Sequence, residues 1–139
     1  MSFYLSSKRH NLYKKNLNHK CHILKFCYFG IKAVNFGIVT KNKNIFLQKL
    51  LDKQIKLISK KFYAIKMWNL ISMNSTATVL NPESRMGKGK GNISTQFCYI
   101  KPGQILFEFS GISKQQAIQI YKCLKFKLPL KIKMVNLLF

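Results

Sequence analysis

The sequence predicts an α+β protein: one compact domain with an antiparallel or mixed sheet and two helices, preceded by a basic N-terminal arm. Three observations support this. The chain has 139 residues, of which 47% are hydrophobic, including 11 Phe and 6 Tyr, so it can build one sizeable core. Two stretches carry apolar residues at helical spacing, and β-forming runs separate them. No internal repeat or linker-like change of composition divides the chain.

The charge balance restricts the function. The chain has 25 Lys and Arg residues against 3 acidic residues, a formal net charge of +22. So few carboxylates leave most cations without an intramolecular partner, and they repel one another unless an external polyanion neutralises them. Nucleic acid does this best, because each phosphate that is contacted releases condensed counterions. A membrane surface is the competing polyanion.

Membrane insertion and secretion are disfavoured. The longest uncharged stretch, residues 67–82, is diluted by Asn, Ser and Thr and is shorter than the ~20 apolar residues that span a bilayer. The first ten residues lack the apolar core of a signal peptide. Without a secretory signal, the four irregularly spaced cysteines are expected to be reduced thiols. They are Cys21, Cys27, Cys98 and Cys123.

Residues 1–28 are predicted to be an extended basic arm, and residues 29–139 the domain itself. The arm mixes cations with aromatic rings, without a helical or strand period, which suits a segment that folds on RNA and stacks its rings on bases. A solvated tail is the alternative. Its basic residues are Lys8, Arg9, Lys14, Lys15, Lys20 and Lys25.

The first half of the domain opens with a short apolar piece and continues with a helix. Gly30 and Gly37 bracket IKAVNF, which predicts a strand or turn. Thr40 is a plausible N-cap for the helix. Apolar residues then recur at helical spacing, with lysines on the other faces. The apolar positions are Leu47, Leu51, Ile55, Ile58 and Phe62.

The second half is predicted from strand patterns and turn residues. The run 62–68 predicts a strand, residues 69–84 a polar connection, and residues 97–101 and 105–109 a β-hairpin around Pro-Gly-Gln. Ser113 and Gln116 form a capping-box pattern. A helix with the stripe Ala117, Ile118, Tyr121, Leu124 and Leu128 follows and ends before Pro129. Residues 130–135 alternate apolar and basic, which predicts a last strand with its lysines on one face.

The segment RMGKGKG, residues 85–91, is the most informative motif. Gly87, Gly89 and Gly91 remove side chains at alternate positions, so the backbone can adopt positive φ and approach a polyanion closely. Its three cations suit phosphates, and Arg85 can also stack or bind two oxygens at once. A nucleotide-hydrolysing loop is disfavoured, because the pattern is not GxxxxGK[ST] and does not run from a strand straight into an apolar-periodic helix. It also lacks the acidic partner that a Mg²⁺-nucleotide site would need.

Metal and catalytic sites find little support. His19, Cys21, His22 and Cys27 match none of the common zinc spacings, so no metal or other cofactor is expected. Catalysis by a pair of carboxylates is nearly excluded, because the chain has only three acidic residues: Asp52, Glu83 and Glu108. A Cys–His nucleophile pair has no supporting pattern. We therefore expect no enzyme and no catalytic residues.

Several segments together resemble a known family. NPESRMGKGKG (81–91), FCYIKPGQILFEFSGISKQQA (97–117) and KLPLKIKMV (127–135) closely resemble the bacterial-type large-subunit ribosomal protein L-sixteen family. Upstream, FGIKAV (29–34) is similar to that family's FGLKAV. The resemblance covers about residues 8–135 and is most specific from 81 to 135.

The resemblance implies a hammerhead-like fold and a structural, non-catalytic constituent of the large ribosomal subunit. It implies binding to large-subunit ribosomal RNA near the peptidyl-transferase centre, with the loop at 81–92 approaching rRNA and the aminoacyl-site tRNA. Neighbouring ribosomal proteins are the other expected partners, with neither membrane binding nor a homo-oligomer. A free RNA-binding or assembly factor and a membrane-active basic protein are the alternatives. The expected RNA-binding residues are Lys8, Arg9, Lys14, Lys15, Lys20, Lys32, Arg85, Met86, Gly87, Lys88, Gly89, Lys90, Gly91, Lys131 and Lys133.

Composition also suggests an origin. Of the 25 basic residues 23 are Lys, although Arg usually serves better at phosphates, and Ile, Phe, Asn and Tyr are abundant. These residues share A/T-rich codons. The resemblance begins within about eight residues of Met1, which leaves no space for an import sequence of about 15 residues or more. We expect an organelle-encoded protein, in the mitochondrion rather than the plastid because the sequence diverges strongly from the bacterial pattern. An A/T-rich bacterial cytoplasm is the alternative.

Overall fold

The computed structural model describes residues 8, 16–59, 64–87 and 89–137. This part of the chain forms two helices and seven strands, which confirms the predicted α+β class. In chain order they are β1 (Phe29–Ala33), β2 (Gly37–Thr40), α1 (Lys41–Ser59), β3 (Lys66–Asn69), β4 (Ser75–Val79), β5 (Asn92–Ile100), β6 (Ile105–Ser110), α2 (Lys114–Lys125) and β7 (Ile132–Asn136).

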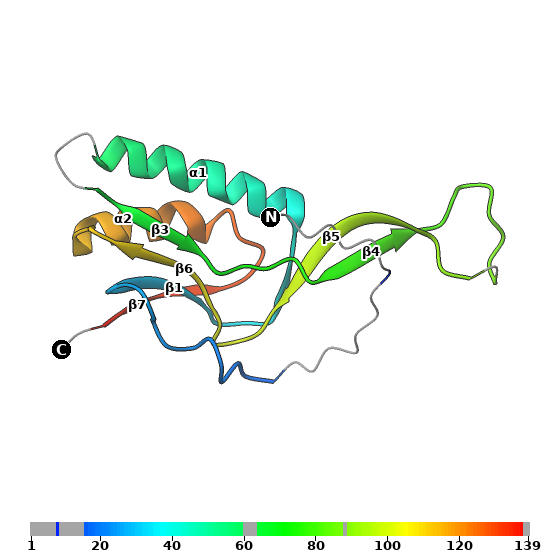
Figure 1. The fold of residues 1–139 in the computed structure, drawn as a ribbon, viewed down its shortest axis with the longest axis horizontal. Coiled ribbons are helices and arrows are strands. Elements are labelled where there is room, and N and C mark those ends of the chain that lie inside the picture. The colour runs from blue at the N-terminus through cyan, green and yellow to red at the C-terminus, as the bar shows by residue number, and fades with distance from the viewer. Residues whose placement is uncertain (1–7, 9–15, 60–63, 88, 138–139) are drawn as a thin grey trace.

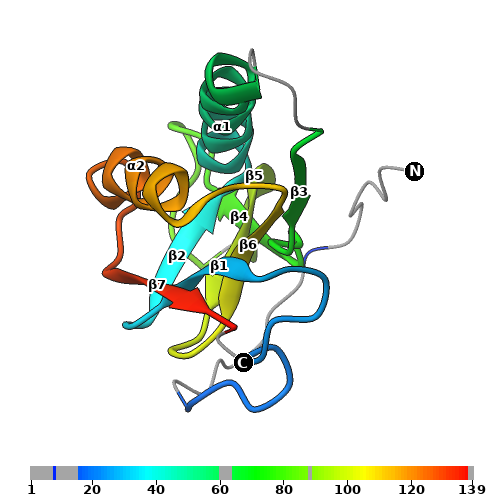
Figure 2. The same ribbon diagram turned by 90° about the vertical axis from the view of Figure 1, so that its left-hand side faces the viewer.

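The strands form two antiparallel sheets. One sheet has four strands in the order β3-β6-β1-β7, and the other has three in the order β2-β5-β4. Both helices lie on the same side of the four-stranded sheet, and the long β4–β5 pair projects away from this body (Figures 1 and 2). The chain thus has a packed body at one end and a two-stranded extension at the other.

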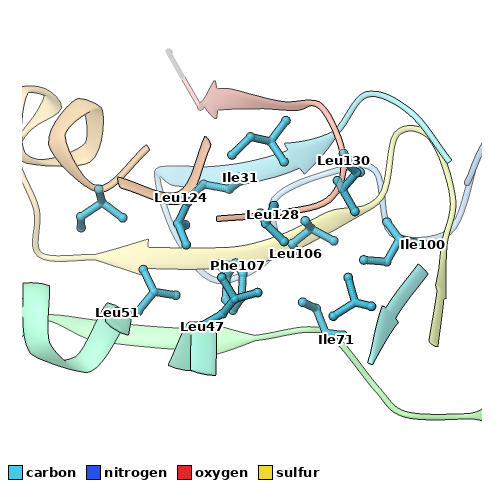
Figure 3. Packing of buried hydrophobic residues seen from close by; sticks show 14 of the residues in the cluster. Ile31, Leu47, Leu51, Ile71, Ile100, Leu106, Phe107, Leu124, Leu128 and Leu130 are labelled. Atoms are coloured by element: carbon cyan, nitrogen blue, oxygen red, sulfur yellow. The ribbon is translucent and has the colours of Figure 1, made fainter. Parts of the chain in front are cut away.

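The core lies between the helices and the four-stranded sheet. Leu47 and Leu51 of α1 and Leu124 of α2 are completely buried, and they gather around Phe107 of β6 and Ile31 of β1 (Figure 3). Every residue of β6 from Ile105 to Phe109 is buried, as expected for a central strand covered on both faces. The predicted stripes are confirmed for most of their residues: Leu47, Leu51, Ala117, Leu124 and Leu128 are buried, and Ile55, Ile58 and Tyr121 pack against the core. The prediction is wrong at Ile118, which is only half-buried, whereas Ile120 is buried in the core. Phe62 lies outside the described residues.

Local sequence signals place the helix starts correctly. Thr40 precedes α1, and its hydroxyl accepts from the backbone N–H of Lys43 at 3.4 Å. Ser113 caps α2 with a complete capping box: its hydroxyl accepts from the Gln116 backbone, and the Gln116 side chain accepts from the Ser113 backbone. Such a cap contributes about 1 kcal/mol. The helix ends at Lys125, four residues before Pro129.

The predicted hairpin between residues 97–101 and 105–109 is wrong. β5 pairs with β2 and β4, whereas β6 pairs with β1 and β3. The turn itself exists, since the Gln104 backbone N–H donates to the Lys101 carbonyl at 3.2 Å. The two strands diverge after it, so this turn connects the two sheets.

The region before the glycine-rich loop also differs from the prediction. Residues 69–84 are not only a polar connection, because they contain β4, which forms an edge of the three-stranded sheet. The strand expected at 62–68 is β3, residues 66–69, and residues 60–63 lie outside the described part. The last strand runs from Ile132 to Asn136, and it alternates as predicted: Leu130 and Ile132 are buried, while Lys131 and Lys133 are exposed.

Residues 16–28, which we call the N-terminal segment, lie against the face of the four-stranded sheet that the helices leave open (Figure 2). Leu24 and Cys27 are buried there. Leu24 occupies the place where a side chain on Gly30 would stand, which explains the glycine in β1. The segment is also tied to the sheet connection, because the Ile105 backbone N–H donates to the Cys21 carbonyl at 2.9 Å. This part of the predicted arm therefore contacts the domain directly.

Candidate nucleic-acid interface

The RMGKGKG motif lies at the far end of the β4–β5 extension (Figure 1). β4 ends at Val79 and β5 begins at Asn92, so the motif belongs to the connection between them. A turn starts this connection, in which the Ser84 backbone N–H donates to the Asn81 carbonyl at 2.9 Å. The side chains of Arg85 and Met86 are exposed, Met86 to 94%. The loop therefore presents its side chains away from the core.

The three glycines of the motif have two different structural reasons. Gly87 and Gly89 have φ angles of 95° and 87°, in the left-handed region that other residues rarely adopt. A Cβ atom at either position would meet nothing within 4 Å, so backbone conformation alone explains them. Gly91 packs against the backbone of Val79, where a Cβ atom would overlap the carbonyl. Gly91 therefore closes the base of the loop, and the first two glycines shape its tip.

A cavity of about 170 Å³ lies at the base of this loop. Polar and basic side chains make up most of its lining, which consists of Leu80, Asn81, Ser84, Arg85, Gly89, Lys90, Gly91 and Asn92. The Lys90 ammonium is buried and has no hydrogen-bond partner among the described residues. The Lys90 carbonyl accepts from the Lys8 ammonium at 2.9 Å, which brings another cation to the loop. A desolvated ammonium without a counter-charge is costly, so this cavity suits an anionic group.

The remaining expected RNA-binding residues divide between the loop and the body. Lys8 joins the loop, as described above. Lys20 is exposed on the N-terminal segment, Lys131 and Lys133 are exposed at β7, and Lys32 is half-buried in β1. Arg9, Lys14, Lys15 and Lys88 lie outside the described residues. The fold thus brings the predicted cations to two separate places, the extension and the side of the sheet opposite the helices.

Sequence reasoning missed the structural role of Glu108. This carboxylate is fully buried and accepts from the backbone N–H groups of Lys25, at 3.2 and 3.3 Å, and of Phe26, at 2.8 Å. Backbone donors offset part of the cost of burying a charge, and here they attach the N-terminal segment to β6. The detectable signal was an acidic residue inside the apolar run ILFEF.

The other candidate chemistries have no assembled site in the structure. Within residues 16–59, 64–87 and 89–137 and at Lys8, no group of three His, Cys, Asp or Glu side chains could hold a metal ion. The four cysteines are free. Burial raises the pKa of the Cys27 thiol to about 11, with a smaller contribution from the Glu108 charge, and burial raises that of Cys98 to about 11 as well. No helix in the described part of the chain is long and apolar enough to cross a bilayer.

A strongly basic α+β domain that carries a donor-rich loop on a protruding strand pair is typical of proteins built into ribonucleoprotein particles. The family Ribosomal protein L16p/L10e matches residues 4–135. The chain belongs to this family, and it is a structural constituent of the large ribosomal subunit. Membership implies binding to ribosomal RNA and to other large-subunit proteins, and the family is structural rather than catalytic.

Two curated relatives support the assignment. The large ribosomal subunit protein uL16m of Chondrus crispus is 39% identical over 130 residues, which cover 94% of this chain and 94% of the relative. The large ribosomal subunit protein uL16c of Emiliania huxleyi is 28% identical over 129 residues, which cover 93% of this chain and 89% of the relative. The first is a mitochondrial protein and the second a chloroplast protein.

Proposed function

We propose that this protein binds large-subunit rRNA near the peptidyl-transferase centre and that its loop at residues 85–91 also contacts the aminoacyl-site tRNA. The observation that carries the proposal is the buried ammonium of Lys90, which has no partner among the described residues and lies in a cavity with polar and basic lining at the base of that loop. An RNA phosphate in this cavity would supply the missing counter-charge. The exposed Arg85 next to it would reach the same backbone or a stacked base.

The loop's backbone supports the same function. Gly87 and Gly89 have open space where side chains would stand, so RNA can come close to the main chain and accept from its N–H groups. Lys8, Lys14, Lys15 and Lys20, together with Arg9, would add phosphate contacts along the N-terminal part of the chain. The protein acts in this proposal by positioning RNA, as a single copy and without a cofactor.

The proposed location is the mitochondrial large subunit, with the gene in the organelle. The higher identity to the mitochondrial relative than to the chloroplast relative favours this location, and the excess of Lys over Arg suits an A/T-rich genome. Sequencing DNA from purified mitochondria tests the location of the gene. A gene found in plastid or bacterial DNA instead would contradict it.

Two measurements test the function. Stable co-sedimentation with large subunits in high salt is expected for an integral constituent, whereas a free assembly factor would dissociate and a membrane-active protein would sediment with vesicles. Ultraviolet cross-linking of ribosomes with tRNA in the aminoacyl site should then join residues 85–91 to rRNA and to that tRNA. Stable association without cross-links from the loop would contradict the proposed role of the loop.

A further inference from the structure

A second hollow lies on the body of the protein, away from the glycine-rich loop. It encloses about 600 Å³, which is within the range of about 300–1,000 Å³ common for ligand-binding pockets. It lies where β1 and β7 meet the turn after β5. In Figure 1 these elements belong to the body, from which the β4–β5 pair projects. Its lining residues are Lys32, Ala33, Val34, Gly103, Lys133, Met134, Val135 and Asn136.

Two lysines face each other beside this hollow. Lys32 of β1 and Lys133 of β7 are directly paired in the antiparallel ladder, so their side chains leave the sheet on the same face, with Cβ atoms about 5 Å apart. Like charges in this arrangement destabilise a sheet. Glu108, on the same face, already accepts three hydrogen bonds from the N-terminal segment. The pair therefore has no counter-charge among the described residues, and an anionic ligand would supply one.

The Lys32 ammonium has a fixed position. It donates to the His22 carbonyl at 3.0 Å, which leaves two of its three donors available. His22 belongs to the N-terminal segment. Glu108 holds this segment in place by accepting from the backbone N–H groups of Lys25 and Phe26, which begin three residues after His22. Glu108 thus acts as a positioning residue for Lys32, through the backbone of residues 22–26. The turn after β5 supports the other side, where the Gly103 backbone N–H donates to the Ala33 carbonyl at 2.8 Å.

The rest of the lining is mostly apolar, apart from Asn136, whose buried Oδ1 has no hydrogen-bond partner among the described residues. Val34 is 48% exposed although it directly follows a buried strand, and Met134 and Val135 are half-buried. A pair of ammonium groups beside exposed apolar surface suits a ligand with one anionic and one flat apolar part. An unstacked nucleotide combines both, and proteins commonly recognise RNA by splaying such nucleotides out.

We propose that this hollow binds one unstacked nucleotide of large-subunit rRNA, with its phosphate between the ammonium groups of Lys32 and Lys133 and its base over Val34. The proposal rests on the proposed function and adds a second RNA contact that is spatially separate from the loop. The protein would then connect two segments of rRNA, one at the loop and one at the body.

The first experiment measures how the full-length protein rebinds to large subunits that have been stripped of it, as a function of salt. Each lost phosphate contact lowers the slope of log K against log salt by about 0.7–0.9. Because Lys32 and Lys133 share one phosphate in this proposal, Lys32→Ala with Lys133→Ala should lower the slope by about that amount. The matched control is Lys53→Ala with Lys56→Ala on the exposed face of α1, which should leave the slope unchanged. Equal slopes for the wild type and the first double variant, or equal losses in both double variants, would overturn the proposal.

The second experiment identifies the occupant. Ultraviolet cross-linking of assembled large subunits, followed by peptide mass spectrometry, should find a nucleotide attached within residues 32–34 or 133–136. A cross-link from these residues to a neighbouring protein, or no cross-link there, would overturn the inference. Cross-links from residues 85–91 in the same sample report on the proposed function separately, so the two can fail independently.

Discussion

The ring of Phe26 stacks on the indole of Trp68, with ring centroids 5.7 Å apart and planes inclined by 11°. The two residues are far apart in sequence, one in the N-terminal segment and the other in β3. Trp68 pairs with Glu108 in the sheet, and Glu108 accepts from the Phe26 backbone, so a stacking contact and a hydrogen bond hold the same residue. Part of the side of the sheet without helices is thereby covered by the chain's own N-terminal residues.

Replacing Glu108 should release this cover. We expect Glu108→Ala to lower the free energy of unfolding by roughly 2–4 kcal/mol, because it removes charge-assisted hydrogen bonds and leaves a cavity. Glu108→Gln retains one acceptor oxygen and should cost less. Hydrogen exchange should accelerate at the Lys25 and Phe26 amides in both variants, while the exposed control Glu83→Gln changes neither measurement. Unchanged protection of both amides in Glu108→Ala would show that this carboxylate does not anchor the segment.

Removing the charges of the loop should affect function more than folding. We expect Arg85→Ala, Lys88→Ala and Lys90→Ala together to change the free energy of unfolding by less than about 1 kcal/mol, because the loop contributes little to the core. Translation by the resulting ribosomes should fall more than the yield of assembled subunits. The control removes Lys49, Lys53 and Lys56 from α1. Normal translation with the triple-alanine loop would show that the loop is a solvated connector.

The glycines of the loop should separate into two classes when substituted. Gly91→Ala should lower the free energy of unfolding by roughly 1–3 kcal/mol and speed amide exchange in β4 and β5, since its Cβ atom would overlap the Val79 backbone. Gly89→Val should leave those amides protected, because nothing surrounds Gly89 and the strain of a β-branched residue at a φ of 87° is confined to the tip of the loop. It should nevertheless impair translation as much as the loss of the charges, by distorting the tip and keeping RNA away from the main chain. Equal amide exchange in the two variants would contradict this distinction.

Thiol reactivity should depend on pH in a defined way. Cys27 and Cys98 have pKa values of about 11 in the fold against 9.0 for an ordinary thiol, so at pH 8 both should react with iodoacetamide more slowly than in the unfolded chain. At pH values between these two pKa values, the folded state binds more protons than the unfolded state. The resulting stabilisation is complete below about pH 9 and is lost as the pH rises to about 11. Cys98→Ser should make the stability curve shallower in that interval, and an unchanged curve would contradict the assignment.

Sequence patterns were sufficient where the structural cause is local. The start of α2 was predicted because the Ser113–Gln116 pair satisfies backbone donors within one turn of helix. The loop at 85–91 was recognised as a candidate site because glycine conformation and charge act over a few residues. A resemblance to a known family then supplied the function that these features by themselves left open.

The failed predictions involve distant partners. The turn after Lys101 has ordinary hairpin residues, and only the pairing of β6 with β1 and β3 draws it away from β5. β4 was missed because its residues, STATV, lie in a polar stretch, although Thr and Val favour strands. The role of Glu108 depends on residues 25 and 26, more than 80 positions away. No local pattern reports such contacts.

The length of β5 determines how far the glycine-rich loop lies from the body of the protein. The strand runs from Ile100, which is completely buried in the body, to Asn92 at the loop, with one irregularity in its pairing opposite Ala77 and Thr78. Its eight residue steps span about 26 Å. The number of residues in β5 therefore sets the distance from the body to the base of the loop. Shortening β4 and β5 by two residues each would keep every side chain on its present face and retract the tip by about 7 Å. The reach of the loop beyond the body is thus encoded as strand length.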